Sequence, residues 1–567
     1  MAGSLNWRVK PESHVQGRSW LATQASAWWV SGVVAFGIIM ILTLSPLIAM
    51  VVQAGSIDWT AVLSNTYIQR VVQFSLTQAL FSTALSLLFA IPVALALAHR
   101  PRFTGRTLIV NLFSLSLVIP TIVAIYGIVA VFGRTGWFNT ALTFITLPSV
   151  PLYGLTGILI AHVFFNMPLA TRVMLVSLES IPATNWRLAK QLGMGPYAIF
   201  RFIEWPSIKS QLPGLAVLIF TLCFTSFAIV MTLGGGPRAT TIEVAIYQAL
   251  RFDFDISLTV ALAAIQLSIC IALMGLSTLF RQDNSLSFTA YSAQSQNDHT
   301  RHYQRLLSSF WTGSIWNVLH VLTILLATMF VLLPLLALII SSFNEKLLPV
   351  LADPMTIQAL LNTTVVALIS AVLSLTLAIS LLISTRHLRI RLQLERTGQW
   401  LQLIGNVILV LPPLVLGTGL FLLLRPFADV FSLALVLVII INSLMALPFV
   451  LRLLDAPIMQ SANRYDRLMQ ALGIRGWSRW RWIDWPQLRR PIALSLALAT
   501  TLSAGDLSAI ALFGSERVRT LPLLLYQRMG SYRLDEAAVT AGILLVLCLV
   551  LFGSIQRVVG GAKDAEN

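Results

Sequence analysis

The chain has 567 residues, of which 57% are hydrophobic and 11% are charged, and its mean hydropathy is +0.82. A soluble protein of ordinary composition carries about twice this fraction of charged residues, so the composition predicts an integral membrane protein. A disulfide-rich secreted domain is excluded, because the chain has only three cysteines and each lies in an apolar run. The net charge is +16, but the basic residues are dispersed and form no continuous nucleic-acid-binding face.

Apolar runs long enough to cross a bilayer recur along the chain after an expected cytoplasmic segment, 1–27. The first half, 28–280, has expected spans at 28–53, 73–98, 107–132, 153–178, 211–233 and 257–280. A polar cytoplasmic linker is expected at 281–314. The second half, 315–558, has expected spans at 315–343, 359–385, 401–424, 430–451, 491–513 and 537–558. With a cytoplasmic tail at 559–567, the pattern predicts an all-α membrane protein of about twelve helices in two six-helix halves.

The positions of the basic residues predict the orientation of these spans. Cytoplasmic loops of membrane proteins carry an excess of Lys and Arg. When both termini are placed in the cytoplasm, most of the 38 Lys and Arg residues fall on inner segments. We therefore expect a multi-pass membrane protein with its N- and C-termini in the cytoplasm.

An internal repeat at an offset of 280 residues relates the two halves. The matched residues include Arg187, Leu188, Leu192, Gly193, Arg201, Trp205 and Pro206 with Arg467, Leu468, Leu472, Gly473, Arg481, Trp485 and Pro486. Because each half has an even number of spans, the halves are expected in parallel topology. The best matched part of the repeat is the inner loop between the fourth and fifth spans, at about 181–209 and again at about 455–490.

Each of these loops has the pattern of two short helices separated by a glycine. The first helices are expected at 183–192 and 464–472, and Gly193 and Gly473 suit left-handed C-caps. The second helix of each loop is expected to end at Trp-Pro. Two related basic loops on one face predict docking of a partner that is itself a two-fold dimer. The alternative is a pair of interfacial helices whose tryptophans lie in the lipid headgroup region.

The loops resemble those of the permeases of ATP-binding-cassette importers, which carry Glu-Ala-Ala, three residues, Gly and then about a dozen residues ending in Leu-Pro. Here the loops begin Arg187-Leu188-Ala189 and Arg467-Leu468-Met469, so Arg stands where that family usually has Glu. The resemblance implies a type I importer fold and a separate ATPase dimer bound at the loops. The residues implied in coupling are Arg187, Ala189, Gly193, Trp205, Pro206, Arg467, Gly473, Trp485 and Pro486.

Nearly the whole chain resembles the fused, double-length permeases of bacterial thiamine importers. The stretches that carry this resemblance are YGLTGILIAHVFFNMPLATR from Tyr153, LGGGPRATTIEVAIYQAL from Leu233 and ALFGSERVRTLPLLLYQRMGSYR from Ala511. It implies a periplasmic binding protein that delivers thiamine, thiamine phosphate or thiamine diphosphate. Iron(III) importers also have fused permeases, so iron(III) is the alternative cargo.

The chain lacks the residues of a P-loop, in which a glycine-rich segment and a lysine hold the phosphates of ATP. None of its five lysines follows a glycine. We therefore expect a permease that is not an enzyme and holds no cofactor of its own, while the partner ATPase binds ATP and magnesium. No metal site is expected.

Polar residues inside spans are costly and so become candidates for the substrate pathway. Asp506 lies in the eleventh expected span, and Ser226 is its match in the repeat. We expect Asp506 to contact a cationic group such as the thiazolium ring of thiamine. The alternative is a helix-packing hydrogen bond. His162 and its mate Asn442 are further pathway candidates, with local hydrogen bonding beside a proline as the alternative.

Two other classes of function were weighed. A secondary carrier also has two parallel halves, but it usually keeps several charged residues inside the bundle, and this chain offers essentially Asp506. A membrane enzyme requires clustered catalytic side chains at recognisable spacing, and none is evident. The sequence therefore predicts the permease of an importer that alternates between outward-facing and inward-facing states.

Overall fold

The computed structural model describes residues 16–561 apart from 56, 117, 280–313, 392–407, 409–410, 475 and 516–517. All regular elements of the described residues are helical, and eleven helices are long and apolar enough to cross a membrane. The expectation of an all-α membrane protein is confirmed. Residues 1–15 of the expected N-terminal segment, 281–313 of the expected linker and 562–567 of the expected tail lie outside the described residues.

The helices of the first half follow one another in the order of the expected spans. They are α1 (Gln16–Ala54), α2 (Trp59–Ser64), α3 (Thr66–His99), α4 (Arg106–Leu115), α5 (Thr121–Phe132), α6 (Trp137–Phe144), α7 (Leu155–Glu179), α8 (Ala183–Gln191), α9 (Pro196–Ile199), the π-helix η1 (Phe200–Glu204), α10 (Trp205–Phe224), α11 (Ala228–Leu233), η2 (Pro237–Ala239), α12 (Ile242–Arg251) and α13 (Ile256–Leu279).

The second half repeats this order with fewer separate pieces. Its helices are α15 (Ser314–Ser342), α16 (Leu347–Ala352), α17 (Pro354–Arg386), the π-helix η4 (His387–Arg391), α19 (Pro413–Leu424), α20 (Ala434–Ala471), α21 (Gly476–Arg479), the π-helix η5 (Trp480–Asp484), α22 (Trp485–Ala504), α23 (Ser508–Phe513), α24 (Leu521–Gly530) and α25 (Leu534–Gly560). The expected span 401–424 is described mainly as α19, which is too short to count among the eleven.

Three of the expected spans, 107–132, 211–233 and 491–513, each consist of two helices. The first is divided into α4 and α5, the second into α10 and α11, and the third into α22 and α23. Pro120 precedes α5 and cannot donate a backbone hydrogen bond. At the third break, a Cβ on Gly505 would lie only 2.7 Å from the Cβ of Pro120. Hydropathy does not detect these breaks because the residues on both sides are apolar.

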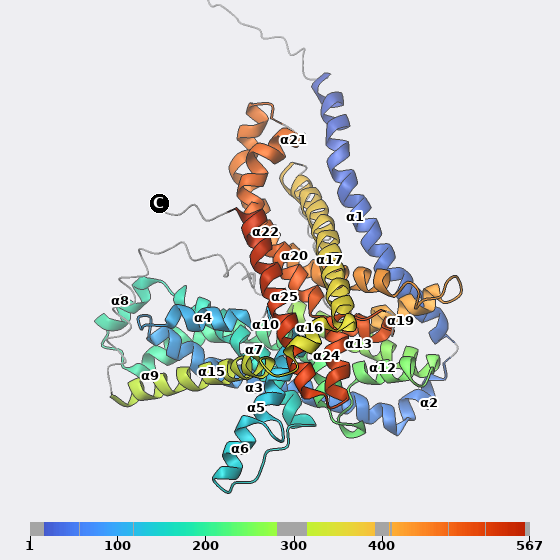
Figure 1. The fold of residues 1–567 in the computed structure, drawn as a ribbon. Helices are drawn as coiled ribbons and strands as arrows, with labels where there is room; N and C mark the ends of the chain where they lie inside the picture. Colours follow the sequence, from blue (N-terminus) through green and yellow to red (C-terminus); the bar gives the residue numbers. More distant parts are fainter. Residues whose placement is uncertain are drawn as a thin grey trace, which may run out of the picture.

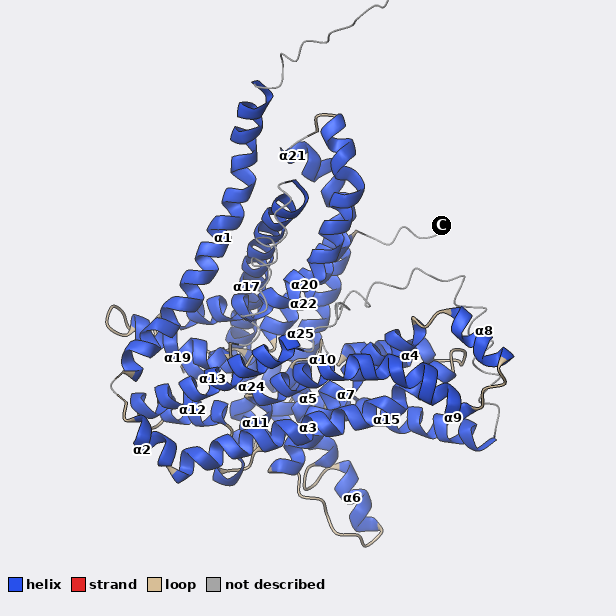
Figure 2. Cartoon of the chain, turned by 180° about the vertical axis from the view of Figure 1, so that it is seen from behind, coloured by secondary structure: helices blue, strands red, loops and turns tan. Residues whose placement is uncertain are grey.

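The helices form two arms that diverge from a common base (Figure 1). In one arm α3, α4, α7 and α15 lie side by side, and in the other α17, α20, α22 and α25 do. The first helix of each half packs on the opposite half: α1 contacts α17 and α19, whereas α15 contacts α3 and α5. Figure 2 shows the same exchange from behind. The two halves are therefore interlocked.

Two matched glycine–proline crossings permit this exchange. A Cβ on Gly127 of α5 would collide with the backbone of Pro334 in α15, and a Cβ on Gly419 of α19 would collide with the backbone of Pro46 in α1. Small residues allow helix backbones to approach closely in a membrane, where packing rather than hydrophobicity drives helix association. The exchanged helices thus depend on glycine at equivalent positions of both halves.

Candidate functional site

The two repeated loops lie at the far ends of the two arms, with α8 and α9 on one and α21 on the other (Figures 1 and 2). α8 ends before Gly193, whose φ is +62°. The amide of Met194 donates to the carbonyl of Ala189 at 3.0 Å and that of Gly193 to Lys190 at 3.2 Å, a Schellman motif. Gly473 has a φ of +66°, so the expectation of left-handed C-caps is confirmed at both loops.

The second loop begins differently from the first. The expected separate helix at 464–472 is instead the last part of α20, which continues without a break from Ala434 to Ala471. Its two internal prolines, Pro448 and Pro457, do not end it. In the first half α7 ends at Glu179, and α8 begins after Pro182.

The expected helix end at Trp-Pro was also wrong. The chain remains helical through Trp205-Pro206 and Trp485-Pro486, which begin α10 and α22, and a five-residue π-helix precedes each pair. Proline lacks an amide proton and its ring crowds the preceding turn of an α-helix, so the wider π-turn accommodates it. Each loop is thereby joined directly to a membrane span.

Four pairs of large apolar side chains are exposed at the same positions of both loops. Their exposed fractions run from 51% to 78%, and the pairs are Leu188 and Leu468, Leu192 and Leu472, Tyr197 and Trp477, and Phe202 and Trp482. Arg187 and Arg467 are also exposed, whereas Ala189 is buried. Exposed apolar patches with charged neighbours are typical of interaction surfaces. The arms therefore present two related apolar and basic surfaces, here called the loop surfaces.

The two loop surfaces are supported by different chemistry. Beneath the first, Trp186, Ala189 and Ile199 form a small apolar cluster. In the second half the mates of Trp186 and Ile199 are Asp466 and Arg479, which form a buried ion pair. The Arg479 Nε atom also lies 3.2 Å from Oδ2 of Asp484. Hydropathy comparison misses this equivalence, because an apolar contact in one half corresponds to a salt bridge in the other.

A buried carboxylate ties each loop to the end of the second span of its half. Glu204, the last residue of η1, lies 2.6 Å from Nε2 of His99, the last residue of α3. Asp484, the last residue of η5, lies 3.4 Å from Nη1 of Arg386, the last residue of α17. These pairs join each loop to a membrane helix. The Glu204–Asp484 match in the repeat is the sequence signal for this contact.

His162 and Asn442 lie inside their own halves rather than together. His162 is buried, and its Nδ1 atom lies 2.8 Å from Oγ of Ser82 in α3. The side-chain amide of Asn442 donates to Oγ of Ser503 in α22 at 3.0 Å. These contacts are the local hydrogen bonds of the alternative interpretation, and a pathway role for either residue stays a prediction.

Asp506 and Ser226 occupy equivalent helix breaks, between α22 and α23 and between α10 and α11. The carboxylate of Asp506 accepts hydrogen bonds from the amides of Ser508 at 3.2 Å and Ala509 at 3.0 Å, so it caps α23. Both side chains are partly accessible. The capping contacts explain how a carboxylate is tolerated there.

One buried carboxylate was missed by the sequence reasoning. Glu243 lies in the first turn of α12, is fully buried, and its Oε1 atom accepts a hydrogen bond from the side-chain amide of Gln266 in α13 at 2.7 Å. Burial, with a smaller contribution from the charge of Asp506, raises the pKa of Glu243 to about 8. The available signal was an acidic residue inside an otherwise apolar segment, Thr241–Ala245.

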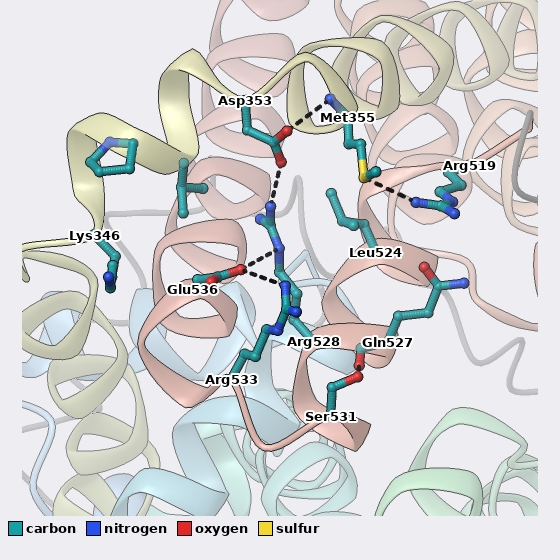
Figure 3. Close-up of a pocket in the computed structure, with 12 residues that line it drawn as sticks. Lys346, Asp353, Met355, Arg519, Leu524, Gln527, Arg528, Ser531, Arg533 and Glu536 are labelled. Atoms are coloured by element: carbon teal, nitrogen blue, oxygen red, sulfur yellow. Dashed lines mark hydrogen bonds and ion pairs between the residues drawn. The ribbon is translucent and has the colours of Figure 1, made fainter.

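A pocket of about 520 Å³ opens at the base of the second arm, away from α21 (Figure 3). Arg528 lies between Asp353, at 2.7 Å, and Glu536, at 3.5 Å. Three further basic residues line the pocket, Lys346, Arg519 and Arg533. Because the two carboxylates offset only part of this charge, the pocket is basic.

Comparison with known proteins identifies the repeated unit. The model of a family described as the binding-protein-dependent transport system inner membrane component matches residues 90–285 and again residues 391–561. Each match contains one of the two loop surfaces.

Individual relatives align over nearly the whole chain. The thiamine transport system permease protein ThiP of Escherichia coli (strain K12) is 42% identical over 534 residues, which cover 94% of this chain and 97% of that protein. The proteins of the same name from Brucella abortus (strain 2308) and Haemophilus influenzae are 41% and 39% identical. Their alignments cover 94% and 95% of this chain, and 96% and 97% of the relatives.

Proposed function

The chain belongs to the family of binding-protein-dependent transport system inner membrane components, and we propose that it carries thiamine or its phosphates across the bacterial inner membrane. The observation that supports this cargo most directly is the 39–42% identity, over at least 94% of the chain, to thiamine transport system permeases. The duplicated family match supports a single chain that supplies both halves of the permease.

The proposed partner at the loop surfaces is a separate ATPase dimer that binds and hydrolyses ATP. Two related surfaces on one chain suit a partner with two-fold symmetry. Their exposed apolar side chains and arginines offer contact area, and the pairs Glu204–His99 and Asp484–Arg386 join them to α3 and α17. In this proposal the loop surfaces and both chain termini lie on the cytoplasmic side.

Closing of the ATPase dimer draws the two arms together in this mechanism, and hydrolysis releases them. In the structure the arms diverge toward the loop surfaces (Figure 1). We assign this arrangement to an inward-facing state. A ligand moves such an equilibrium only if it binds the two states with different affinity. ATP has that property in this mechanism because it binds more tightly to the closed ATPase dimer than to the open one.

At the opposite end, a periplasmic binding protein is proposed to deliver the substrate. The basic pocket around Arg528 lies on this face and suits acidic side chains of the partner. Lys346 and Arg533 are exposed, so they are available for such contacts. Asp506 and Ser226, at the two helix breaks, and His162 and Asn442, inside the halves, are the proposed residues of the substrate pathway.

The test is uptake into proteoliposomes that contain this chain, its ATPase and the binding protein. Labelled thiamine is offered with ATP inside, and ferric iron is added as competitor. ATP-dependent thiamine uptake that iron does not reduce supports the proposal. Iron uptake in place of thiamine assigns the alternative cargo, and uptake by the chain alone under a proton gradient contradicts an importer.

A further inference from the structure

Two unpaired acceptor atoms lie side by side in the interior near the base of the arms. Oε2 of Glu243 and Oε1 of Gln266 are both buried, and neither has a hydrogen-bond partner among the described residues. The two side chains are held together by the bond from Gln266 Nε2 to Glu243 Oε1. A buried acceptor without a donor is destabilising, so this arrangement needs an explanation.

A second negative group approaches from the other half. Glu243 belongs to α12 of the first half, which packs against α3, α13 and α19, and α19 in turn packs against α23. Asp506 caps α23, and its charge contributes to the raised pKa of Glu243. The two carboxylates thus come from opposite halves of the repeat, and they lie where the halves meet.

This inference rests on the proposed function: we propose that Glu243, Gln266 and Asp506 form a binding site for the organic cation that the permease carries. In the ionised form of Glu243 the unpaired groups at this position are acceptors, so the missing partner is a donor or a positive charge. Thiamine supplies both, through its thiazolium ring and its amino group. A resident metal ion is less suited, since the described residues contain no group of three or more His, Cys, Asp or Glu arranged to hold one.

The location gives the site a role in transport. Glu243 and Gln266 are fully buried in the present arrangement, so a substrate reaches them only when the halves separate at the base. Burial keeps the pKa of Glu243 well above its usual range, and a cation bound between Glu243 and Asp506 favours ionisation of both carboxyl groups. The cargo then favours the arrangement in which both halves contact it, which is the differential interaction that a transport cycle requires.

The test compares thiamine with a neutral isostere in which an uncharged aromatic ring replaces the thiazolium. Uptake of each is measured in proteoliposomes with the ATPase and the binding protein, for the wild type and for Glu243→Gln. Loss of one charge-assisted contact is expected to reduce thiamine uptake about tenfold or more, and to change uptake of the isostere less than about twofold. Glu345→Gln, which removes an exposed carboxylate near the outer pocket, is the matched control.

Several outcomes separate this inference from the proposed function. If Glu243→Gln reduces uptake of both compounds equally, or leaves thiamine uptake unchanged, the proposed binding site is wrong while the cargo assignment stands. Absence of thiamine uptake by the wild type contradicts the proposed function itself. A requirement for sodium that disappears in Glu243→Gln indicates an inorganic cation and overturns the proposal. If Glu243→Gln does not assemble with the ATPase, Asp506→Asn must show the same selective loss of thiamine uptake.

Discussion

At the scale of single residues, the two loops show how one local shape is held by different interactions. The first loop uses the apolar contact between Trp186 and Ile199, and the second uses the ion pair between Asp466 and Arg479 at the same positions of the repeat. A buried ion pair contributes little net stability compared with an apolar contact, but removal of one partner leaves an uncompensated charge. The second loop is therefore the more sensitive to substitution.

We expect Arg479→Leu to destabilise the second loop by about 3–5 kcal/mol, because Asp466 loses its ion-pair partner and Asp484 keeps only Arg386 and the hydroxyl of Ser461. Hydrogen exchange should increase in α21 and η5 and stay unchanged in α8 and α9. The double variant Asp466→Trp with Arg479→Ile copies the first loop and should restore protection. Unchanged exchange in Arg479→Leu would show that the ion pair does not support the loop.

The glycines that end the first helix of each loop permit a sharper test. Gly193→Ala places a side chain at a φ of +62°, which costs about 1–2 kcal/mol, although its Cβ meets no atom within 4 Å. We expect weaker binding of the ATPase in a pull-down at limiting concentration. Gly195→Ala, where the φ is −75° and the space is equally open, should bind as the wild type does. Equal binding by both variants would contradict a conformational role for Gly193.

At the scale of helices, the exchange of α1 and α15 between the halves makes the two repeats mutually dependent. Neither half buries all its helices without the first helix of the other, as the contacts of α1 with α17 and of α15 with α5 show. At the glycine–proline crossings of this exchange an added Cβ would meet backbone atoms, which cannot move aside as a side chain can. Added volume at these positions is therefore expected to impair assembly.

We predict that Gly127→Ala and Gly419→Ala each lower the folded yield and the thermal stability in detergent, because the new Cβ collides with the backbone at Pro334 or Pro46. Size-exclusion chromatography with a fluorescent fusion measures both. Gly553→Ala in α25 has open space around its Cβ and serves as the control, for which no loss is expected. A folded yield equal to that of the control would mean that the helices move apart without cost.

At the scale of the whole molecule, the divergence of the arms predicts a large movement of the loop surfaces. Thr184 of α8 and Arg464 of α20 are exposed and equivalent in the repeat, so they suit spin labels after substitution by cysteine. The native cysteines are buried. The distance between the labels should shorten when ATP binds to the assembled complex. A pair at Thr104 and Thr184, within one arm, should keep its distance.

The candidate site could be predicted from the sequence only where its signal is local. Gly193 and Gly473 end helices through the conformation of their own backbone, and the repeat located both loops. Glu243 was missed because its significance depends on Gln266 in the next helix and on Asp506 in the other half. Arg479 was seen only as a basic residue, since its buried partners are not adjacent to it in the chain.

The sequence by itself determined the membrane class, the duplicated helical architecture and the positions of the two loops, because hydropathy, repeat spacing and glycine preference act over short stretches of chain. The tertiary structure decided where α4 and α5, and α22 and α23, separate, and which half each first helix joins. Those features arise from close contacts between segments hundreds of residues apart, such as Gly505 with Pro120 and Gly127 with Pro334. Helices that are apolar throughout do not encode such pairings in their periodicity, so only packing selects among them.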